Sequence, residues 1–485
     1  MAPSPGARVH HPRMGPGVVR GVLDGGRTWL VAFDARPRAP FLLPAAEFEI
    51  ATPRSGAKPA KPRAPTAAEI RKAAEEARRR QEEARMDALR HTPTGASPVD
   101  RQSIEALRLG VVPVRGLDRL TVGREEERAA LNALFDAGRG MRVLSGGYGA
   151  GKTHFIELAE SEALARGYLV ARATFDPDET PPSHPLRIYG SLMEGLRYPE
   201  GPGQGLRPLL ERLSTSEAHT TPKGARVHRW LSPAAWALHH LHDEDVVARL
   251  LDWVEGQTLD DASMLTDRLV RAGWTGARLL ALPDYRTFGQ IAAYLLGGIA
   301  VWARDAGWKG LVVLLDEAEY FDQLGATSKE MAENLLKYLA GATLPPEALA
   351  FDPGAVYRGG QAVHRAIPAV YDAEQPLMVL CAFTPNPQID AALRRLLRRS
   401  DERIDLEALP ARYFPLLADR VLGMFMEVYP GMDPPTPYRM AIRRALQLAY
   451  DAGEIGTTRQ AARIVVEYWD LYRSDPDRAK SALRV

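Results

Sequence analysis

The chain has 485 residues, 45% of them hydrophobic and 25% charged, which excludes wholesale disorder and allows roughly three folded domains. Its 62 basic and 61 acidic residues leave a net charge of +1, which excludes a strongly basic protein but not a local basic patch. The single cysteine, Cys381, excludes an intramolecular disulfide and a multi-cysteine zinc site. It lies in an apolar run, which predicts a buried thiol.

The sequence has no evident targeting or membrane-spanning segment. Its N-terminus lacks a basic region followed by an apolar stretch. The longest apolar run, about Ile291 to Ala303, is shorter than the roughly 20 residues that a membrane span needs. We therefore expect a cytoplasmic protein with no membrane partner.

The first part of the chain divides into a small β unit and a connecting segment. In residues 1–50, short apolar stretches such as Val18-Val19 and Trp29 to Phe33 alternate with turn residues, which predicts a small all-β domain. Residues 51–98 begin with a Pro/Ala-rich stretch and continue as a charged segment with few large apolar residues. This composition predicts a linker and a solvated spacer helix.

From about residue 99 onward, apolar runs alternate with helical patterns. The predicted strands are Met141 to Ser145, Tyr168 to Phe175, Leu311 to Leu315, Leu377 to Phe383 and Arg403 to Leu406. Continuous apolar runs separated by helices predict an α/β fold with a buried parallel sheet. We expect this core to span residues 99–410, with a helical insertion at about 190–285, followed by a C-terminal helical lid over residues 411–485.

The strongest motif is a phosphate-binding loop between the first predicted strand and a helix. The segment Gly146-Gly147-Tyr148-Gly149-Ala150-Gly151-Lys152-Thr153 fits the Walker A pattern G-x-x-x-x-G-K-[ST]. Glycines let consecutive backbone N–H groups face one phosphate, and the N-terminus of the next helix adds a favourable dipole. We expect Lys152 to reach the β- and γ-phosphates and the Thr153 hydroxyl to bind Mg²⁺. All eight residues, with His154 at the start of the helix, are therefore candidate nucleotide-binding residues.

A second motif supplies paired acids. The run Leu311-Val312-Val313-Leu314-Leu315 ends in Asp316-Glu317, the pattern of a Walker B strand. Asp316 is the candidate Mg²⁺ ligand, and Glu317 is the candidate base that polarises the attacking water. An acid directly after Asp316 is typical of the additional-strand, catalytic-glutamate branch of P-loop NTPases.

Polar and basic residues after the later strands supply further candidates. Thr384 or Asn386, after the strand that ends at Phe383, could hold the attacking water, and we select Asn386 without excluding Thr384. Arg394, Arg395, Arg398, Arg399 and Arg403 are candidates for an arginine finger that acts on a neighbouring subunit. We select Arg399 and Arg403. A solvated basic helix face is the alternative for each of these arginines.

Near the C-terminus, Gly456 and Thr457 precede a predicted helix for which Thr457 or Thr458 is the expected N-cap. The next residue, Arg459, is expected to touch the nucleotide from the lid.

These residues resemble a known family. The chain is similar to AAA+ ATPases of the ORC/STAND-like group, and more closely to the BREX-system ATP-binding proteins, the BrxC/BrxD family of phage-defence loci. The similarity spans about residues 99–470 and includes the segments Ser103 to Pro113, Leu120 to Glu125, Gly147 to Phe155, Asp316-Glu317 and Thr458-Arg459-Gln460. It implies an AAA+ fold, and it implies that Val122, Gly123 and Arg124 lie beside the adenine.

The N-terminal unit has a separate likeness. Residues Gly6 to Val19 resemble the opening of CarD-type and helicase-tail Tudor-like barrels, with Met14 where those barrels usually have phenylalanine. The resemblance implies a small barrel that contacts polymerase or other proteins, and sometimes nucleic acid.

Taken together, these features predict an ATP- and Mg²⁺-dependent ATPase. The resemblance adds a role in phage defence, a homo-oligomer, and DNA or a DNA-processing partner such as a helicase, contacted through the N-terminal barrel. An ATP-dependent scaffold that recruits a helicase is one alternative, favoured by the tether on the N-terminal unit. A STAND-like signalling ATPase is a second, against which the chain shows no repeat array. A small-molecule kinase is the third.

Overall fold

The computed structural model describes residues 6–12, 14–23, 27–34, 36–44, 46, 48–50, 98–113, 116–259, 261–318, 324–368, 370–398, 402–429 and 431–482. The chain divides into two compact units, Met1–Asp87 and Ala88–Val485. The linker and spacer helix expected over residues 51–98 lie outside the described residues, apart from Pro98, which begins helix α2. A search of the described helices finds none long and apolar enough to cross a membrane.

The first unit is an antiparallel sheet with its own small core. Its strands are β1 (Arg8–His11), β2 (Gly15–Leu23), β3 (Thr28–Phe33), β4 (Arg36–Pro44) and β5 (Glu49–Ile50), arranged in the order β4-β3-β2-β1-β5. The core consists of Val9, Val19, Trp29, Val31 and Phe33. The small all-β unit expected from the sequence is therefore confirmed.

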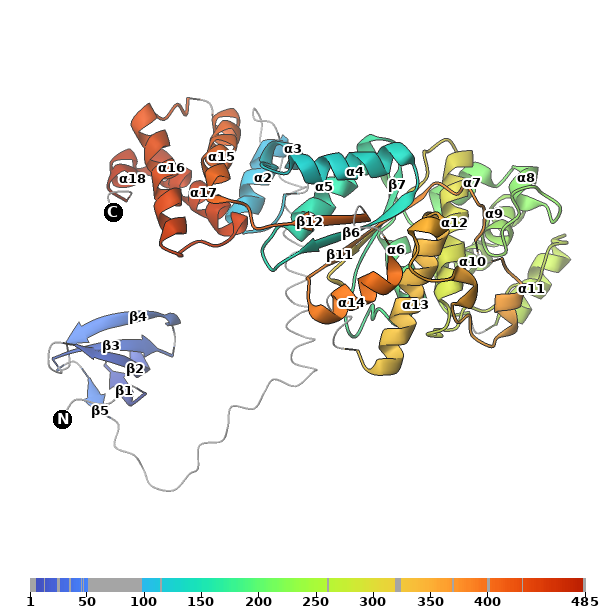
Figure 1. Ribbon diagram of the computed structural model, residues 1–485, viewed down its shortest axis with the longest axis horizontal. Helices are drawn as coiled ribbons and strands as arrows, with labels where there is room; N and C mark the ends of the chain where they lie inside the picture. Colours follow the sequence, from blue (N-terminus) through green and yellow to red (C-terminus); the bar gives the residue numbers. More distant parts are fainter. Residues whose placement is uncertain are drawn as a thin grey trace, which may run out of the picture. The chain divides into compact units, whose positions relative to one another are not determined.

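The second unit is built around a seven-stranded sheet, which Figure 1 shows between layers of helices. Its strands are β6 (Gly140–Gly146), β7 (Leu169–Thr174), β8 (Arg197–Tyr198), β9 (Gly201–Gln204), β10 (Leu311–Asp316), β11 (Leu377–Phe383) and β12 (Arg403–Leu406). The strand order is β12-β6-β11-β10-β7-β8-β9. The first five strands of this order pair in parallel, whereas β8 and β9 form an antiparallel hairpin at one edge. All five strands expected from the sequence are present.

Both faces of the parallel sheet are buried, which explains why its strands are continuous apolar runs. On β10 and β11, alternate residues belong to different hydrophobic clusters: Leu315 and Cys381 to one, Leu314 and Leu380 to the other. Helices α4 (Glu125–Ala137) and α5 (Lys152–Ala165) cover one face. Helices α12 (Gly289–Asp305), α13 (Ala326–Thr343) and α14 (Pro387–Leu396) cover the other. Cys381 is buried as expected, and burial raises the pKa of its thiol to about 12.

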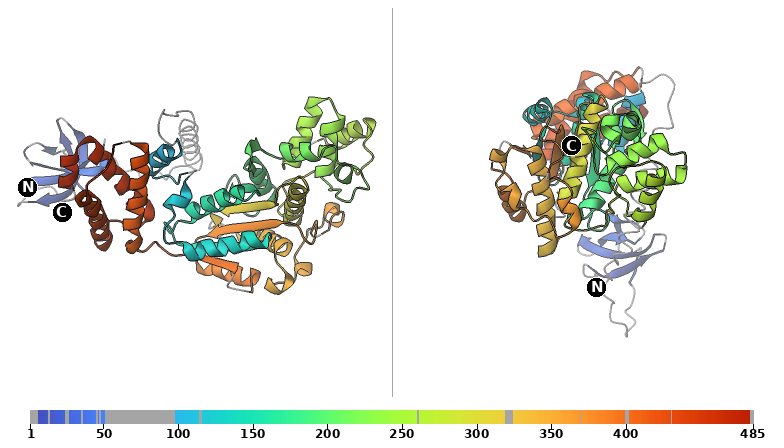
Figure 2. Two further views of the ribbon diagram at one scale, coloured as in Figure 1. Left: turned by 90° about the horizontal axis from the view of Figure 1, so that it is seen from above. Right: turned by 90° about the vertical axis from the view of Figure 1, so that its right-hand side faces the viewer.

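The segment between β7 and β10 is mainly helical, as expected, but it also contains the β8–β9 hairpin. Its helices are α6 (Pro185–Glu194), α7 (Arg207–Leu213), α8 (Glu217–Thr220), α9 (Leu231–His240), α10 (Glu244–Val254) and α11 (Ala262–Arg271). They extend the hydrophobic cluster of the α12 face, with Trp230 and Trp253 fully buried. Figure 2 shows these helices at the end of the sheet opposite the C-terminal helices.

The C-terminal helices share a core with segments from the start of the second unit. Helices α15 (Phe414–Val428), α16 (Thr436–Asp451), α17 (Thr458–Ser474) and α18 (Pro476–Ala482) pack with α2 (Pro98–Arg108). The Arg108 guanidinium donates to both carboxylate oxygens of Asp470, at 2.9 and 3.0 Å, and so ties α2 to α17. The same cluster contains Leu120 and Val122, so the C-terminal helices reach the segment expected to lie beside the nucleotide.

Candidate nucleotide-binding site

The expected site residues come together at the carboxyl edge of the parallel sheet. The β6 strand leads into the phosphate-binding loop, β10 ends in Asp316, and β11 lies hydrogen-bonded between these two strands. The pairing register places Leu315 opposite Cys381 and Ser145 opposite Phe383, so the three strands end at nearly the same level. In parallel α/β sheets, ligands bind outside this edge.

The loop between β6 and α5 has the backbone that its glycines allow. Gly149 and Gly151 adopt positive φ angles of 79° and 100°, which side chains with a Cβ rarely adopt. Helix α5 begins at Lys152 with no side-chain cap and no acidic residue in its first turn. The first N–H groups of a helix lack partners within the helix, so this terminus fits an anionic phosphate.

The Lys152 ammonium lies between the loop and the end of β11. Its Nζ donates hydrogen bonds to the Gly146 carbonyl oxygen at 3.0 Å and to the Thr384 hydroxyl oxygen at 2.9 Å. The Asn386 side chain caps α14, because its Oδ1 accepts from the backbone N–H groups of Gln388 (3.0 Å) and Ile389 (2.9 Å). Of the two residues considered after β11, Thr384 is thus the one in contact with the Walker A lysine.

The two acids at the end of β10 have different environments. Asp316 is buried, and its Oδ1 accepts a hydrogen bond of 2.9 Å from the Glu317 backbone N–H. Glu317 is exposed and has a φ of 57°, the only positive value at a non-glycine position among the described residues. Strained backbone of this kind clusters at functional sites.

Sequence analysis did not identify Arg172, the partly buried cation beside Asp316. Arg172 lies on β7 opposite Leu314, and its guanidinium is 3.6 Å from the Asp316 carboxylate. It also pairs with Glu157 and lies 3.5 Å from Glu160, both on α5. Burial alone would lower the Arg172 pKa, but these three carboxylates raise it, so the residue stays charged. The feature of the sequence that could have identified Arg172 is its position as a charged residue inside the apolar run of β7.

The segment expected beside the adenine is fastened to the P-loop by two side chains. The Arg124 guanidinium donates to the carbonyl oxygens of Ala150 (2.8 Å) and Glu407 (2.7 Å). The Thr121 hydroxyl donates to the Leu117 carbonyl oxygen at 2.7 Å and lies 2.8 Å from His154 Nε2. Because the hydroxyl proton is used, His154 Nε2–H is the donor of this second bond. Burial lowers the His154 pKa to about 4, which keeps the ring neutral.

The remaining nucleotide-binding candidates differ in exposure. Val122 is buried in the cluster of the C-terminal helices, and Gly123 lies against the Tyr413 ring. Gly147 faces open space, and Tyr148 is 95% exposed at the tip of the loop. Neither residue packs against the rest of the protein.

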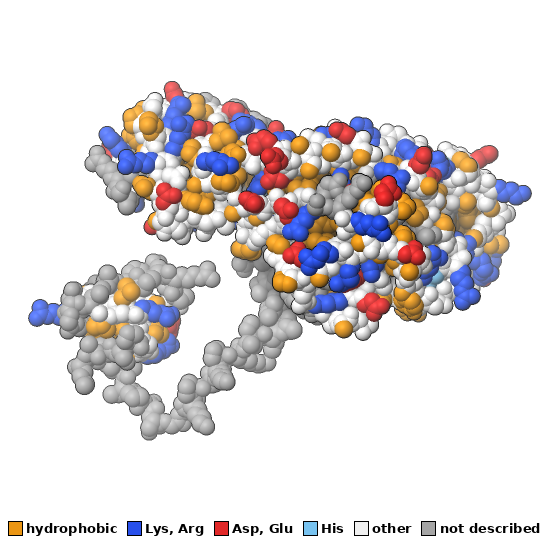
Figure 3. All heavy atoms as spheres, in the orientation of Figure 1, with side chains coloured by type: hydrophobic (Ala, Val, Ile, Leu, Met, Phe, Trp, Pro, Cys, Tyr) orange, Lys and Arg blue, Asp and Glu red, His pale blue; other side chains and the backbone are white. Residues whose placement is uncertain are grey.

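The arginines proposed as finger candidates lie on or near α14 and differ in how the structure places them. Figure 3 shows Lys and Arg side chains over α13 and α14, and Arg394 and Arg395 lie on α14, with Arg398 just after it. Arg399 lies outside the described residues. Arg403 is held by residues of the same chain: it donates to Ser145 Oγ at 2.8 Å, to Asp405 at 2.6 Å and to Asp390 at 3.2 Å.

The lid contacts the P-loop through the first residues of α17. Thr457 is the N-cap of this helix and forms a capping box with Gln460. Of the two N-caps expected from the sequence, Thr457 and Thr458, the first is confirmed. A Cβ added to Gly149 would lie 2.6 Å from the Thr457 methyl carbon, so the Gly149 backbone lies against the Thr457 side chain. Arg459 follows on the first turn, exposed and beside Gly110.

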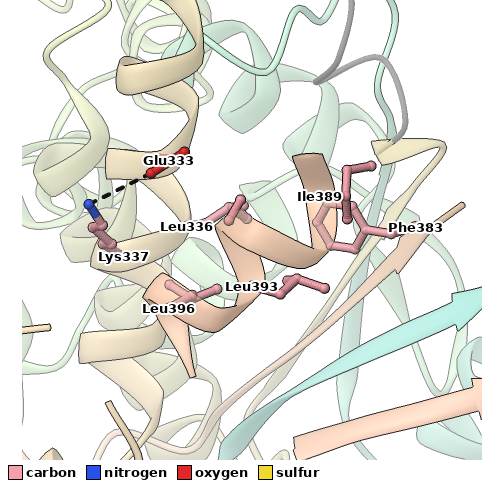
Figure 4. A pocket seen from close by; sticks show the side chains of 8 residues that line it. Glu333, Leu336, Lys337, Phe383, Ile389, Leu393 and Leu396 are labelled. Atoms are coloured by element: carbon pink, nitrogen blue, oxygen red, sulfur yellow. Dashed lines mark ion pairs between the residues drawn. The ribbon is translucent and has the colours of Figure 1, made fainter. Parts of the chain in front are cut away.

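A groove near this edge lies on the opposite face of the sheet from α5. Figure 4 shows Leu336 of α13 facing Phe383 and the apolar side chains of α14, with Glu333 and Lys337 of α13, which pair with each other, also lining the groove. Phe383 belongs to the hydrophobic cluster of the α12 face, whereas the P-loop helix packs on the other. The groove is therefore separate from the phosphate-binding loop.

The strand order and these motifs define a P-loop nucleoside triphosphatase fold of the additional-strand class, with one strand between the Walker A and Walker B strands. Residues 97–225 match the model of the family described as BREX system ATP-binding protein BrxC/D. The resemblance expected from the sequence is confirmed for this segment, which contains the P-loop but not β10.

Comparison with solved structures and curated proteins adds little beyond the family match. The Walker-type ATPase PABY2304 of Pyrococcus abyssi is similar at 13% identity and a TM-score of 0.33, over 75% of this chain and 71% of that one. Among curated proteins, no similar sequence was found.

Proposed function

We propose that this protein binds ATP with Mg²⁺ at the P-loop and hydrolyses it. The observation that carries the proposal is the meeting of three strand ends at one sheet edge, where Lys152 contacts Thr384 one strand away from Asp316-Glu317. The uncapped N-terminus of α5 supports phosphate binding. Thr153 and Asp316 offer hydroxyl and carboxylate oxygens, the ligand type that Mg²⁺ prefers.

Each residue has a role that its environment supports. Lys152 and the backbone N–H groups of the loop would hold the β- and γ-phosphates, in place of the oxygens that the ammonium now contacts. Glu317 would accept the proton of the attacking water, and Thr384, rather than Asn386, would orient that water beside Lys152. Mg²⁺ held by Thr153 and Asp316 would neutralise charge on the phosphates. Arg172 acts indirectly, by holding the Asp316 carboxylate.

The same contacts indicate which residues would lie near the nucleobase. Val122 and Gly123 would line the adenine, while Arg124 and His154 would position this segment against the P-loop. Arg459 would reach the phosphates from the lid. Because Arg403 is engaged within its own subunit, Arg394, Arg398 or Arg399 is the better choice for a finger in a homo-oligomer.

The decisive test compares two variants of the full chain. Glu317→Gln should bind ATP as tightly as wild type but hydrolyse it at least about 100-fold more slowly, because general-base catalysis is lost. Lys152→Ala should lose binding itself. The measurements are phosphate release and equilibrium binding of a fluorescent ATP analogue. Hydrolysis at the wild-type rate by Glu317→Gln would remove Glu317 from the mechanism.

The family match supports a role in BREX-type phage defence. We propose that the protein acts there with DNA or a DNA-processing protein. An ATP-dependent loader that recruits a helicase is the second candidate. The separate core of the N-terminal unit favours it, because such a unit can bind a partner on its own. ATP turnover that duplex DNA stimulates, with movement along the duplex, would argue against the loader.

A further inference from the structure

Two loops of the second unit form a surface that the ATPase chemistry does not use. One loop precedes α12 and contains Tyr285 to Phe288, and the other follows α13, over residues 353–366. Helices α12 and α13 pack side by side (Figure 1). The loops touch each other: the Thr287 hydroxyl donates to Gln361 Oε1 at 3.3 Å, and the rings of Phe288 and His364 meet edge-on at 5.3 Å.

Each loop presents a tyrosine to solvent on a well-anchored backbone. Tyr285 is 47% exposed and Tyr357 is 56% exposed. The Tyr338 hydroxyl fixes the second loop, because it lies 3.2 and 3.1 Å from the carbonyl oxygens of Val356 and Tyr357. The Tyr285 ring packs edge-on against the buried Phe288 ring at 5.2 Å. Both aromatic rings are therefore presented by ordered loops that a ligand need not reorganise.

Arginines accompany both tyrosines. Arg286, Arg358 and Arg365 are exposed, and Arg358 and Arg365 have no hydrogen bond or ion pair with any residue that the structure describes. Arg286 contacts His184 Nε2 at 3.3 Å. Asp284, the acidic residue next to Tyr285 in sequence, is already paired with Arg187 at 2.6 Å and with His184. The surface thus combines unneutralised positive charge with two exposed aromatic faces.

We propose that Tyr285, Tyr357, Arg286, Arg358 and Arg365 form a binding surface for single-stranded nucleic acid. Bases stack on exposed aromatic rings, and arginines bind the phosphates between them. A duplex hides its base faces and would use only the arginines. This proposal specifies the proposed action on DNA further. Binding of a single strand to this surface, however, requires neither bound ATP nor its hydrolysis.

The test measures binding of the full chain to a fluorescent oligothymidine by anisotropy, without ATP, over a range of salt concentrations. Tyr285→Ala/Tyr357→Ala removes both rings, and Arg358→Ala/Arg365→Ala removes two unpaired charges. Tyr450→Ala and Arg420→Ala are the matched controls, since both residues are exposed on the C-terminal helices. Lys152→Ala separates this surface from the ATPase site.

The double tyrosine variant should bind at least about tenfold more weakly at all salt concentrations, because stacking is lost. The double arginine variant should bind more weakly and reduce the slope of log K against log salt by about 1.4. The controls and Lys152→Ala should bind like wild type. The proposal is wrong if wild type does not bind the oligomer, if duplex binds as tightly, or if the tyrosine variant binds like wild type. Failure of ATP hydrolysis alone would leave it standing.

Discussion

At the scale of single residues, His228 shows how burial links the fold to pH. The ring is fully buried against Tyr294 and Tyr371, and its Nδ1 accepts hydrogen bonds from the backbone N–H groups of Trp230 (3.2 Å) and Leu231 (3.0 Å). Burial lowers its pKa from 6.5 to about 3. A proton on Nδ1 would break both bonds, so the folded protein requires the neutral ring.

This environment predicts how stability depends on pH. Below about pH 6.5 the unfolded chain protonates His228 while the folded chain does not, so the unfolded state binds more protons and the free energy of unfolding falls. The loss is up to about 1.4 kcal/mol per pH unit, or about 2 kcal/mol between pH 7.5 and 5. In His228→Asn, the amide oxygen can still accept both N–H groups but does not titrate.

The measurement is urea unfolding followed by tryptophan fluorescence at pH 7.5 and 5. We expect His228→Asn to be less stable than wild type at pH 7.5, because it loses the ring contacts. The difference should shrink by about 2 kcal/mol at pH 5. A constant difference between the two pH values would show that His228 does not contribute to acid sensitivity.

At the scale of elements, the N-terminus of α17 rests on the P-loop at Gly149. A Cβ at this position would meet the Thr457 methyl carbon at 2.6 Å, and the φ of 79° adds backbone strain. Gly149→Ala should therefore lower the thermal midpoint and slow ATP hydrolysis. Thr457→Ser keeps the capping hydroxyl but removes the methyl group, so Gly149→Ala/Thr457→Ser should recover part of both losses.

The double variant separates the clash from the strain. The strain, about 1–3 kcal/mol, should remain in Gly149→Ala/Thr457→Ser, because it belongs to the loop backbone alone. Calorimetric midpoints and steady-state rates are measured for wild type, Gly149→Ala, Thr457→Ser and the double variant, which together form a double-mutant cycle. Strictly additive effects of the two substitutions would contradict the contact between the lid and the loop.

The elements also show what could be predicted from the sequence. The strands of the parallel sheet were predictable because they are buried on both faces, and the P-loop because its glycines and lysine are adjacent in sequence. Arg172 and the Thr384 contact were not, because they depend on which strands become neighbours across long stretches of chain. The His154–Thr121 bond joins segments 33 residues apart, and neither residue type by itself predicts the other.

At the scale of the whole molecule, the division of the hydrophobic clusters indicates which parts can be separated. The cluster of the first unit draws on residues 9–48, and the other three draw on residues 104–479. The C-terminal helices, in contrast, share their cluster with Ile104, Leu120 and Val122. They are therefore part of the nucleotide-binding unit in terms of packing, although they follow it in sequence.

Two truncations test this difference. A chain of residues 88–485 should keep the thermal midpoint of the main transition and bind ATP as the full chain does, because no part of its core has been removed. A chain of residues 1–406 should lose ATP binding and unfold at lower temperature, since Leu120 and Val122 lose the side chains that bury them. Calorimetry and ATP-analogue binding measure both outcomes. Loss of ATP binding in residues 88–485 would mean that the N-terminal unit completes the site, and would overturn its proposed role as an independent recruiting domain.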